Sequence, residues 1–186
     1  QSFNRITVDG DTSTNDACTL SATDQSSVQL NDCKEEFQNA LNEITKTLAQ
    51  MIIKDGEGAT KFVEIKVGGL SSVDDCLEVA YTVAHSPLVK TALFASDANW
   101  GRILAAVGRS KVDEISIENI DIFINDLQSI ASGEISKDYT EASGSLEMQK
   151  SDITIRISLG AAQTSESVWT TDLSYDYVKI NAEYRS

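Results

Sequence analysis

The chain has 186 residues, of which 41% are hydrophobic and 24% charged, a composition typical of a soluble globular protein with one or two domains. Its net charge of −14 argues against nucleic acid, whose phosphates bind basic surfaces, and against an anionic membrane surface. No stretch reaches the roughly 20 apolar residues of a membrane span, and the N-terminus lacks the apolar segment of a signal peptide.

The first 33 residues combine short apolar patterns with polar stretches. Residues 3–8 are expected to form a strand, and residues 17–21 a second, shorter one. Between them, residues 9–16 are rich in Asp, Ser, Thr and Asn, which predicts an ordinary loop. Residues 22–33 are expected to be a surface connection.

A long amphipathic helix is predicted next. It begins at Asn31 or Asp32, either of which suits an N-cap, and ends at Lys54. Apolar residues recur along it at steps of three and four, which predicts one apolar face. They are Phe37, Ala40, Leu41, Ile44, Leu48, Met51 and Ile52.

The connection from this helix to the next predicted strand, residues 62–67, carries Glu57 between Gly56 and Gly58. Glycine permits positive φ and the close approach of another group, so the acid is presented on a tight connection without crowding side chains. In one interpretation a glycine caps the helix and Glu57 is a solvated turn residue. In the other, its carboxylate points into a cleft and binds a substrate cation.

A glycine pair ends this strand, and we expect two domains, residues 1–69 and 70–186. Helices are predicted from about residue 71 to His85 and from residue 97 to Gly108. The expected strands are residues 88–94, one or two within 115–124, then 146–148, 153–157 and 173–180. Residues 131–144 are expected to be a loop. The later strands follow one another without helices between them, so an α+β fold of three helices and about eight strands is predicted.

No complete catalytic motif is visible in the residues alone, since both G-x-S-x-G and G-x-G-x-x-G are missing. Cys18, Cys33 and Cys76 contain no C-x-x-C pair, which favours reduced thiols in a cytoplasmic protein and no metal site. The single histidine, His85, is expected to be a cation at a helix C-terminus, with a general base as the alternative.

Five stretches, in order along the chain, resemble motifs of the ornithine acetyltransferase family, the bifunctional glutamate N-acetyltransferases. They are residues 2–16 (SFNRITVDGDTSTND), 54–62 (KDGEGATKF), 86–92 (SPLVKTA), 97–108 (DANWGRILAAVG) and 177–186 (YVKINAEYRS). Each motif alone would be weak evidence. Together they extend the resemblance from Ser2 to Ser186.

The resemblance implies a precursor that cleaves itself into α and β chains, with the new N-terminal Thr of the β chain as nucleophile. Such an enzyme moves acetyl from N-acetylornithine to glutamate in arginine biosynthesis through an acetyl-enzyme. Some members also accept acetyl-CoA, and no other cofactor is expected. The implied fold is an αββα-type core completed by the α chain, with a smaller C-terminal α+β lobe, in a cytoplasmic α2β2 heterotetramer.

The family pattern transfers substrate contacts to Glu57, Asn181 and Ser186. Glu57 would bind a substrate ammonium and Asn181 an amino-acid head group, while Ser186, where members often carry Thr, would supply a hydroxyl. Residues 9–16 would then form a polar wall of the active site. Without the resemblance, Asn181 and Ser186 would be interpreted as an ordinary strand end and a frayed terminus.

The chain begins at Gln1 rather than Thr, inside the family's β chain, so we expect the nucleophile some tens of residues upstream and no catalytic residue in this chain. The family's oxyanion donors would lie in the α chain. Two hypotheses stay open. The chain is either part of an enzyme that an α chain completes, or a non-catalytic β-chain remnant that binds a ligand or a partner.

Overall fold

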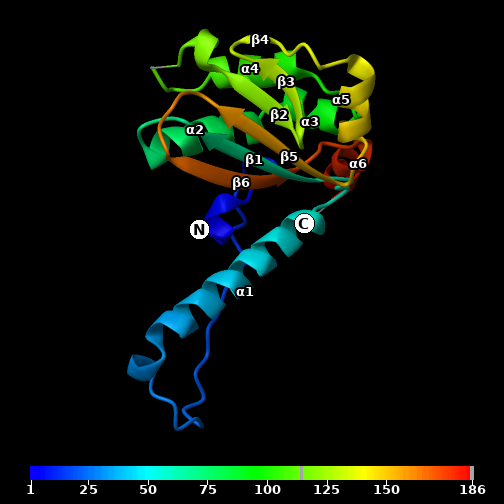
Figure 1. Cartoon of the computed structure of the whole chain (residues 1–186). Coiled ribbons are helices and arrows are strands. Elements are labelled where there is room, and N and C mark those ends of the chain that lie inside the picture. Colours follow the sequence, from blue (N-terminus) through cyan, green and yellow to red (C-terminus); the bar gives the residue numbers. More distant parts are fainter. Residues whose placement is uncertain (114, 185–186) are drawn as a thin grey trace.

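The computed structural model of the chain describes residues 1–113 and 115–184, and these form a six-stranded sheet with helices around it (Figure 1). The helices are α1 (Lys34–Lys54), α2 (Val73–Ala84), α3 (Pro87–Phe94), α4 (Trp100–Gly108), α5 (Glu141–Met148) and α6 (Tyr175–Glu183). The strands are β1 (Phe62–Gly68), β2 (Asp121–Ile124), β3 (Leu127–Ala131), β4 (Glu134–Ile135), β5 (Asp152–Ser158) and β6 (Ser165–Thr171). Within the described residues, no helix is long and apolar enough to cross a membrane.

The strand order of the sheet is β4-β3-β2-β5-β1-β6. β1 runs parallel to β5 and antiparallel to β6, and the remaining neighbours pair antiparallel. A mixed sheet with helices confirms the predicted α+β fold. Because β1 lies between two strands from beyond residue 70, both expected domains contribute to this sheet, and the division at residue 69 stays a prediction.

One face of the sheet is buried under helices. Along β1, Val63, Ile65 and Val67 are fully buried, whereas Glu64 is half-buried and Lys66 exposed on the opposite face, as the two-residue period of a strand requires. α2, α3 and α4 lie on the buried side (Figure 1) and form one hydrophobic cluster with β1, β2 and β5. We call the opposite, polar side the second face of the sheet.

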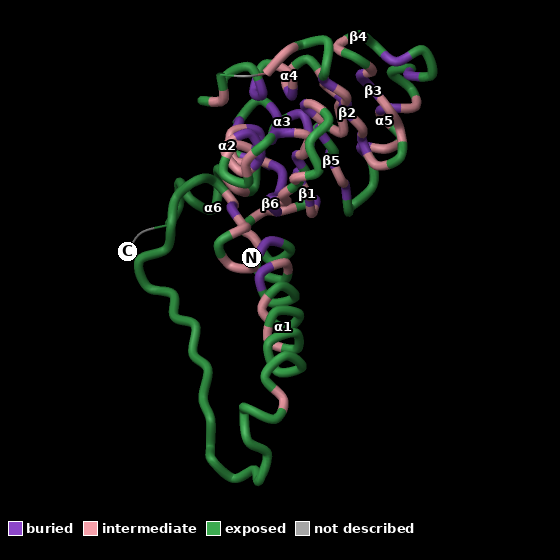
Figure 2. Tube along the Cα trace, turned by 60° about the vertical axis from the view of Figure 1, so that its left-hand side comes forward, coloured by how far each residue is buried: buried purple, intermediate pink, exposed green. Residues whose placement is uncertain are grey.

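The long helix α1 projects away from the body of the molecule (Figure 1, Figure 2). It begins at Lys34 with Cys33 in the N-cap position, so the expected cap at Asn31 or Asp32 lies one or two residues too early. Its buried residues are Ala49 and Ile53, whereas the predicted apolar face is largely exposed. Accessible fractions lie between 44% and 58% for Phe37, Ile44, Leu48, Met51 and Ile52. Apolar surface of this extent is typical of an interaction site.

Five predicted strands are wrong. They are residues 3–8, 17–21, 88–94, 146–148 and 173–180. The first contains a 3₁₀ turn, Phe3–Arg5, and a single bridge between Ile6 and Trp169, while the second has no regular structure and is exposed. The third forms α3, the fourth ends α5, and most of the fifth forms α6.

Helix caps explain why α3 and α6 are helices rather than strands. The Ser86 hydroxyl accepts from the Val89 N–H, and Pro87 occupies the first helical position, where its fixed φ is favourable. The Ser174 hydroxyl accepts from the Tyr177 N–H in the same way. Short apolar runs fit a strand and a buried helical turn equally well, so the caps decide the outcome.

Other elements agree with the sequence. α2 begins after Ser72 and α4 after Asn99, each of whose side chains caps the helix that follows. β1 and β5 lie where strands were predicted. Residues 131–144 are only partly a loop, because β4 and the beginning of α5 lie there; Thr140 and Ser143 form a capping box that begins this helix.

Candidate functional site

The tight connection between α1 and β1 packs against the N-terminus of α6. Gly58 has φ +67°, the left-handed region that favours glycine. A Cβ atom on Gly58 would lie 2.5 Å from the Tyr177 backbone nitrogen and 2.7 Å from Ser174 Oγ. A Cβ atom on Gly56 would meet the Ile53 carbonyl oxygen at 3.2 Å, a milder restriction. The close approach expected at this turn is therefore made at Gly58.

This contact brings together two of the three residues expected to bind substrate. Asn181 Nδ2 donates to Glu57 Oε2 at 2.8 Å and to the Tyr177 carbonyl oxygen at 3.0 Å. Both Glu57 and Asn181 are exposed, so a ligand can reach them. Ser186 lies outside the described residues. The substrate roles of all three residues stay predictions.

Tyr177 extends this cluster towards the N-terminal polar loop. It lies one helical turn before Asn181 in α6, and its hydroxyl donates to Asp9 Oδ2 at 2.7 Å. That hydrogen bond, with burial and the charges of Asp9, Asp11 and Glu57, raises the pKa of Tyr177 to about 12. The negative charges of these three carboxylates therefore raise the pKa of the same phenol, and a local negative potential of this kind attracts cations. We call Asp9, Glu57, Tyr177 and Asn181 the Glu57 site.

His85 lies at the C-terminus of α2, as expected, and its role stays a prediction. Its Nε2 atom lies 3.0 Å from Thr7 Oγ1, which also accepts from the Gly10 N–H at 3.1 Å. Burial lowers the pKa of His85 below its ordinary value and Lys90 lowers it further, against an opposing effect of Asp9. Burial and Lys90 therefore disfavour the cationic form, and the imidazole contacts Thr7, just before the polar loop of residues 9–16.

The sequence model of the ArgJ family matches residues 1–186 of this chain. The chain belongs to the ArgJ family. It is 54% identical over 191 residues to the arginine biosynthesis bifunctional protein ArgJ of Pseudomonas fluorescens and 53% identical to that of Psychrobacter arcticus. Each alignment covers 100% of this chain and 47% of the relative. The chain thus spans about half the length of these curated relatives.

The fold is also shared with a solved ArgJ structure. The crystal structure of the arginine biosynthesis bifunctional protein from Bacillus halodurans matches with a TM-score of 0.89 and 37% sequence identity. The match covers 99% of this chain and 88% of that chain. The family and fold inferred from the five motifs are therefore confirmed.

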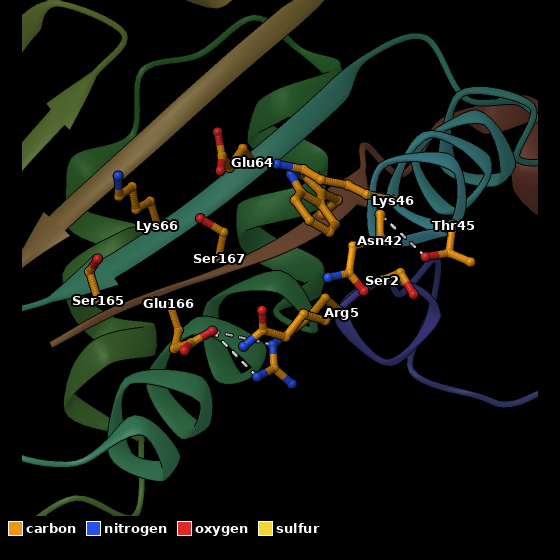
Figure 3. A pocket seen from close by; sticks show the side chains of 12 residues that line it. Ser2, Arg5, Asn42, Thr45, Lys46, Glu64, Lys66, Ser165, Glu166 and Ser167 are labelled. Carbon is orange, nitrogen blue, oxygen red and sulfur yellow. Dashed lines mark hydrogen bonds and ion pairs between the residues drawn. The ribbon is translucent and has the colours of Figure 1, made fainter. Parts of the chain in front are cut away.

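A cavity of about 410 Å³ lies away from the Glu57 site, between α1, the N-terminal 3₁₀ turn and the strands β1 and β6 (Figure 3). On its wall Arg5 pairs with Glu166 at 3.3 Å, and Lys46 Nζ lies 5.3 Å from the centre of the Trp169 ring. No residue of the Glu57 site lines this cavity. Among residues 1–113 and 115–184, no three His, Cys, Asp or Glu side chains are grouped to hold a metal ion.

Sequence reasoning missed the helical form of α6 and, with it, the contact between its N-terminus and Gly58. A signal for the helix was present, because Ser174 precedes Asp176 in the pattern of an N-cap followed by an acid in the first turn. The contact of Tyr177 with Asp9 had no comparable signal. These two residues are 168 positions apart and meet only through the fold.

Proposed function

We propose that the chain is the β-chain part of an ArgJ-family enzyme that moves acetyl from N-acetylornithine to glutamate. Its family and its relatives, which are named arginine biosynthesis bifunctional proteins, support this proposal. The observation that carries it is the 2.8 Å hydrogen bond between Asn181 and Glu57, because the family pattern places substrate contacts on both residues. The alternative, a non-catalytic remnant, predicts no acetyl transfer by the completed enzyme.

In this proposal the Glu57 site binds the free ammonium of N-acetylornithine. Glu57 forms a charge-assisted hydrogen bond to it, and the negative potential of Asp9 strengthens the attraction. Asn181 orients the Glu57 carboxylate and offers a donor and an acceptor to the amino-acid head group. Ser186 supplies a hydroxyl to the same substrate.

The covalent step takes place on a Thr that this chain does not contain. Its hydroxyl oxygen attacks the acetyl carbonyl carbon and the bond to the ornithine nitrogen breaks; that nitrogen takes up the proton from the Thr hydroxyl and leaves as the amine. The amine of glutamate then attacks the acetyl ester, which forms acetylglutamate and regenerates the Thr hydroxyl. The chain described here contributes substrate binding and orientation, whose effect on such reactions is large.

We propose that an α chain from the same precursor covers the exposed apolar face of α1 and the second face of the sheet. The chain has about half the length of its relatives, so a comparable length of protein is left to fill this space. The cavity in Figure 3 lies between the second face of the sheet and another side of α1, which contributes Asn42, Thr45 and Lys46. Two such pairs would form a cytoplasmic α2β2 enzyme.

Residues 1–186 alone are therefore expected to self-associate and to bind an apolar dye. Ile44 and Met51 are 58% and 57% exposed on α1, and replacing both with Glu should reduce dye binding without unfolding the chain. Sedimentation and dye fluorescence measure these effects. A sharp monomer with no dye binding before substitution would contradict the proposed interface.

The proposed activity is tested by acetyl transfer from N-acetylornithine to glutamate, with the 186 residues alone and within the complete enzyme. Acetyl-CoA, offered as the only donor in a parallel reaction, tests whether this member shares the second activity of some relatives. No other cofactor is required by the proposal.

A further inference from the structure

Asp172 follows β6 and is 3% exposed. Its carboxylate accepts from the backbone N–H groups of Thr60 at 2.8 Å and Lys61 at 3.0 Å. It also accepts from the hydroxyl of Thr60 at 2.6 Å and from the hydroxyl of Thr171 at 3.0 Å. Three of these four hydrogen bonds come from Thr60 and Lys61, which follow the Glu57 turn, and two of the three come from the backbone. Hydrogen bonds to an ionised carboxylate are among the stronger ones in proteins.

The same aspartate stands at the entry to α6. Immediately after it, the Leu173 N–H donates to the Lys90 carbonyl oxygen at 3.1 Å, and the Ser174 hydroxyl caps α6 by accepting from the Tyr177 N–H at 3.1 Å. Asp172 therefore binds the segment after the turn that carries Glu57. The next two residues, Leu173 and Ser174, fix where α6, the helix that carries Asn181, begins.

The charge of this carboxylate also acts on two buried lysines. Lys90 Nζ donates to the Thr171 carbonyl oxygen, and Lys61 Nζ donates to the Met148 carbonyl oxygen at 2.7 Å. Burial lowers the pKa of Lys90 to about 8 and also lowers the pKa of Lys61, and in both cases the charge of Asp172 opposes the effect of burial. The charge of Asp172 thus favours the ammonium forms of both lysines.

We propose that Asp172 is a positioning residue that holds Glu57 and Asn181 at hydrogen-bonding distance from each other, so that both contact one substrate. This inference rests on the proposed function. It assigns to Asp172 an effect on substrate binding, exerted through Glu57, rather than a contact with the substrate.

The test is a double-mutant cycle in the complete enzyme. Asp172→Asn keeps the shape of the side chain but removes the charge and one acceptor oxygen, so KM for N-acetylornithine should rise about tenfold while kcat changes less than about threefold. In the Glu57→Gln background the same substitution should cost less than about threefold in kcat/KM, because the carboxylate it positions is already gone. A purely structural role would give the same loss in both backgrounds.

A milder variant covers the case in which Asp172→Asn does not fold. Thr60→Val removes only the hydroxyl that donates to Asp172, and it should raise KM about threefold to tenfold with the same dependence on Glu57. Thr82→Val is the matched control, because the Thr82 hydroxyl donates to a carboxylate of Glu78 on α2, away from the Glu57 site; it should leave KM unchanged.

The outcomes separate the two proposals. A wild-type enzyme that makes no acetylglutamate would overturn the proposed function, and this inference with it. A wild-type enzyme that transfers acetyl, but in which Thr60→Val leaves KM unchanged or costs equally with and without Glu57, would overturn the positioning role of Asp172 alone. The proposal is supported if the loss is in KM and depends on Glu57.

Discussion

In the complete enzyme, Glu57→Gln is expected to lower kcat/KM for N-acetylornithine about tenfold to a hundredfold without changing the unfolding temperature. The substitution removes a charge-assisted hydrogen bond to the substrate ammonium, typically worth about 1.5–3 kcal/mol. The fold should be kept, because Glu57 is exposed and Gln can still accept a hydrogen bond from Asn181. Steady-state kinetics and thermal unfolding on the same preparations measure both effects.

Glu183→Gln is the matched control for this experiment. Glu183 is an exposed carboxylate at the end of α6, two residues beyond Asn181, and it lies outside the Glu57 site. Its substitution should change kcat/KM by no more than about 0.5 kcal/mol, which is about twofold. Equal, small effects of the two substitutions would make Glu57 an ordinary solvated turn residue.

Gly58→Ala is expected to destabilise the chain by about 2 kcal/mol and to lower kcat/KM for N-acetylornithine. An L-residue costs roughly 1–2 kcal/mol in the left-handed region that Gly58 occupies at φ +67°. The new Cβ atom would also lie 2.5 Å from the Tyr177 backbone nitrogen, so the turn or α6 must move. For a protein of this size the loss corresponds to a decrease in Tm of about 4–8 °C.

Gly108→Ala provides the control for Gly58→Ala. Gly108 is the last residue of α4, and a Cβ atom there meets nothing within 4 Å. Because Ala has a higher helix propensity, this substitution should leave stability unchanged or raise it by up to about 1 kcal/mol. If both substitutions lowered Tm equally, the close contact between Gly58 and α6 would not explain the loss of stability, and this prediction would be contradicted.

Elements with strong local signals could be predicted from the sequence. α1 and α2 have long apolar periodicity, α4 begins with the Asn99 cap, and β1 and β5 alternate over seven residues each. α3 and α6 are eight and nine residues long, and their apolar patterns alone do not distinguish a helix from a strand. For α1 the apolar periodicity correctly predicted a helix. It did not predict which side of the helix is buried, because burial depends on what packs against the helix.

The candidate site was only partly predictable for the same reason. The family motifs supplied Glu57 and Asn181, but their contact spans 124 residues and depends on how the Gly58 turn meets α6. Asp172 carries no motif of its own. Its importance comes from hydrogen bonds to residues 111 and 112 positions earlier in the chain, which no local pattern reports.

The central claim is that these 186 residues carry the substrate-binding part of an ArgJ-family acetyltransferase. It is tested most directly by measuring acetylglutamate formed from N-acetylornithine and glutamate, by residues 1–186 alone and by the same residues with the remainder of the precursor. We expect no formation above a protein-free control for the chain alone, and sustained transfer for the complete enzyme. Transfer by the chain alone, or none by the correctly processed and folded complete enzyme, would contradict this account.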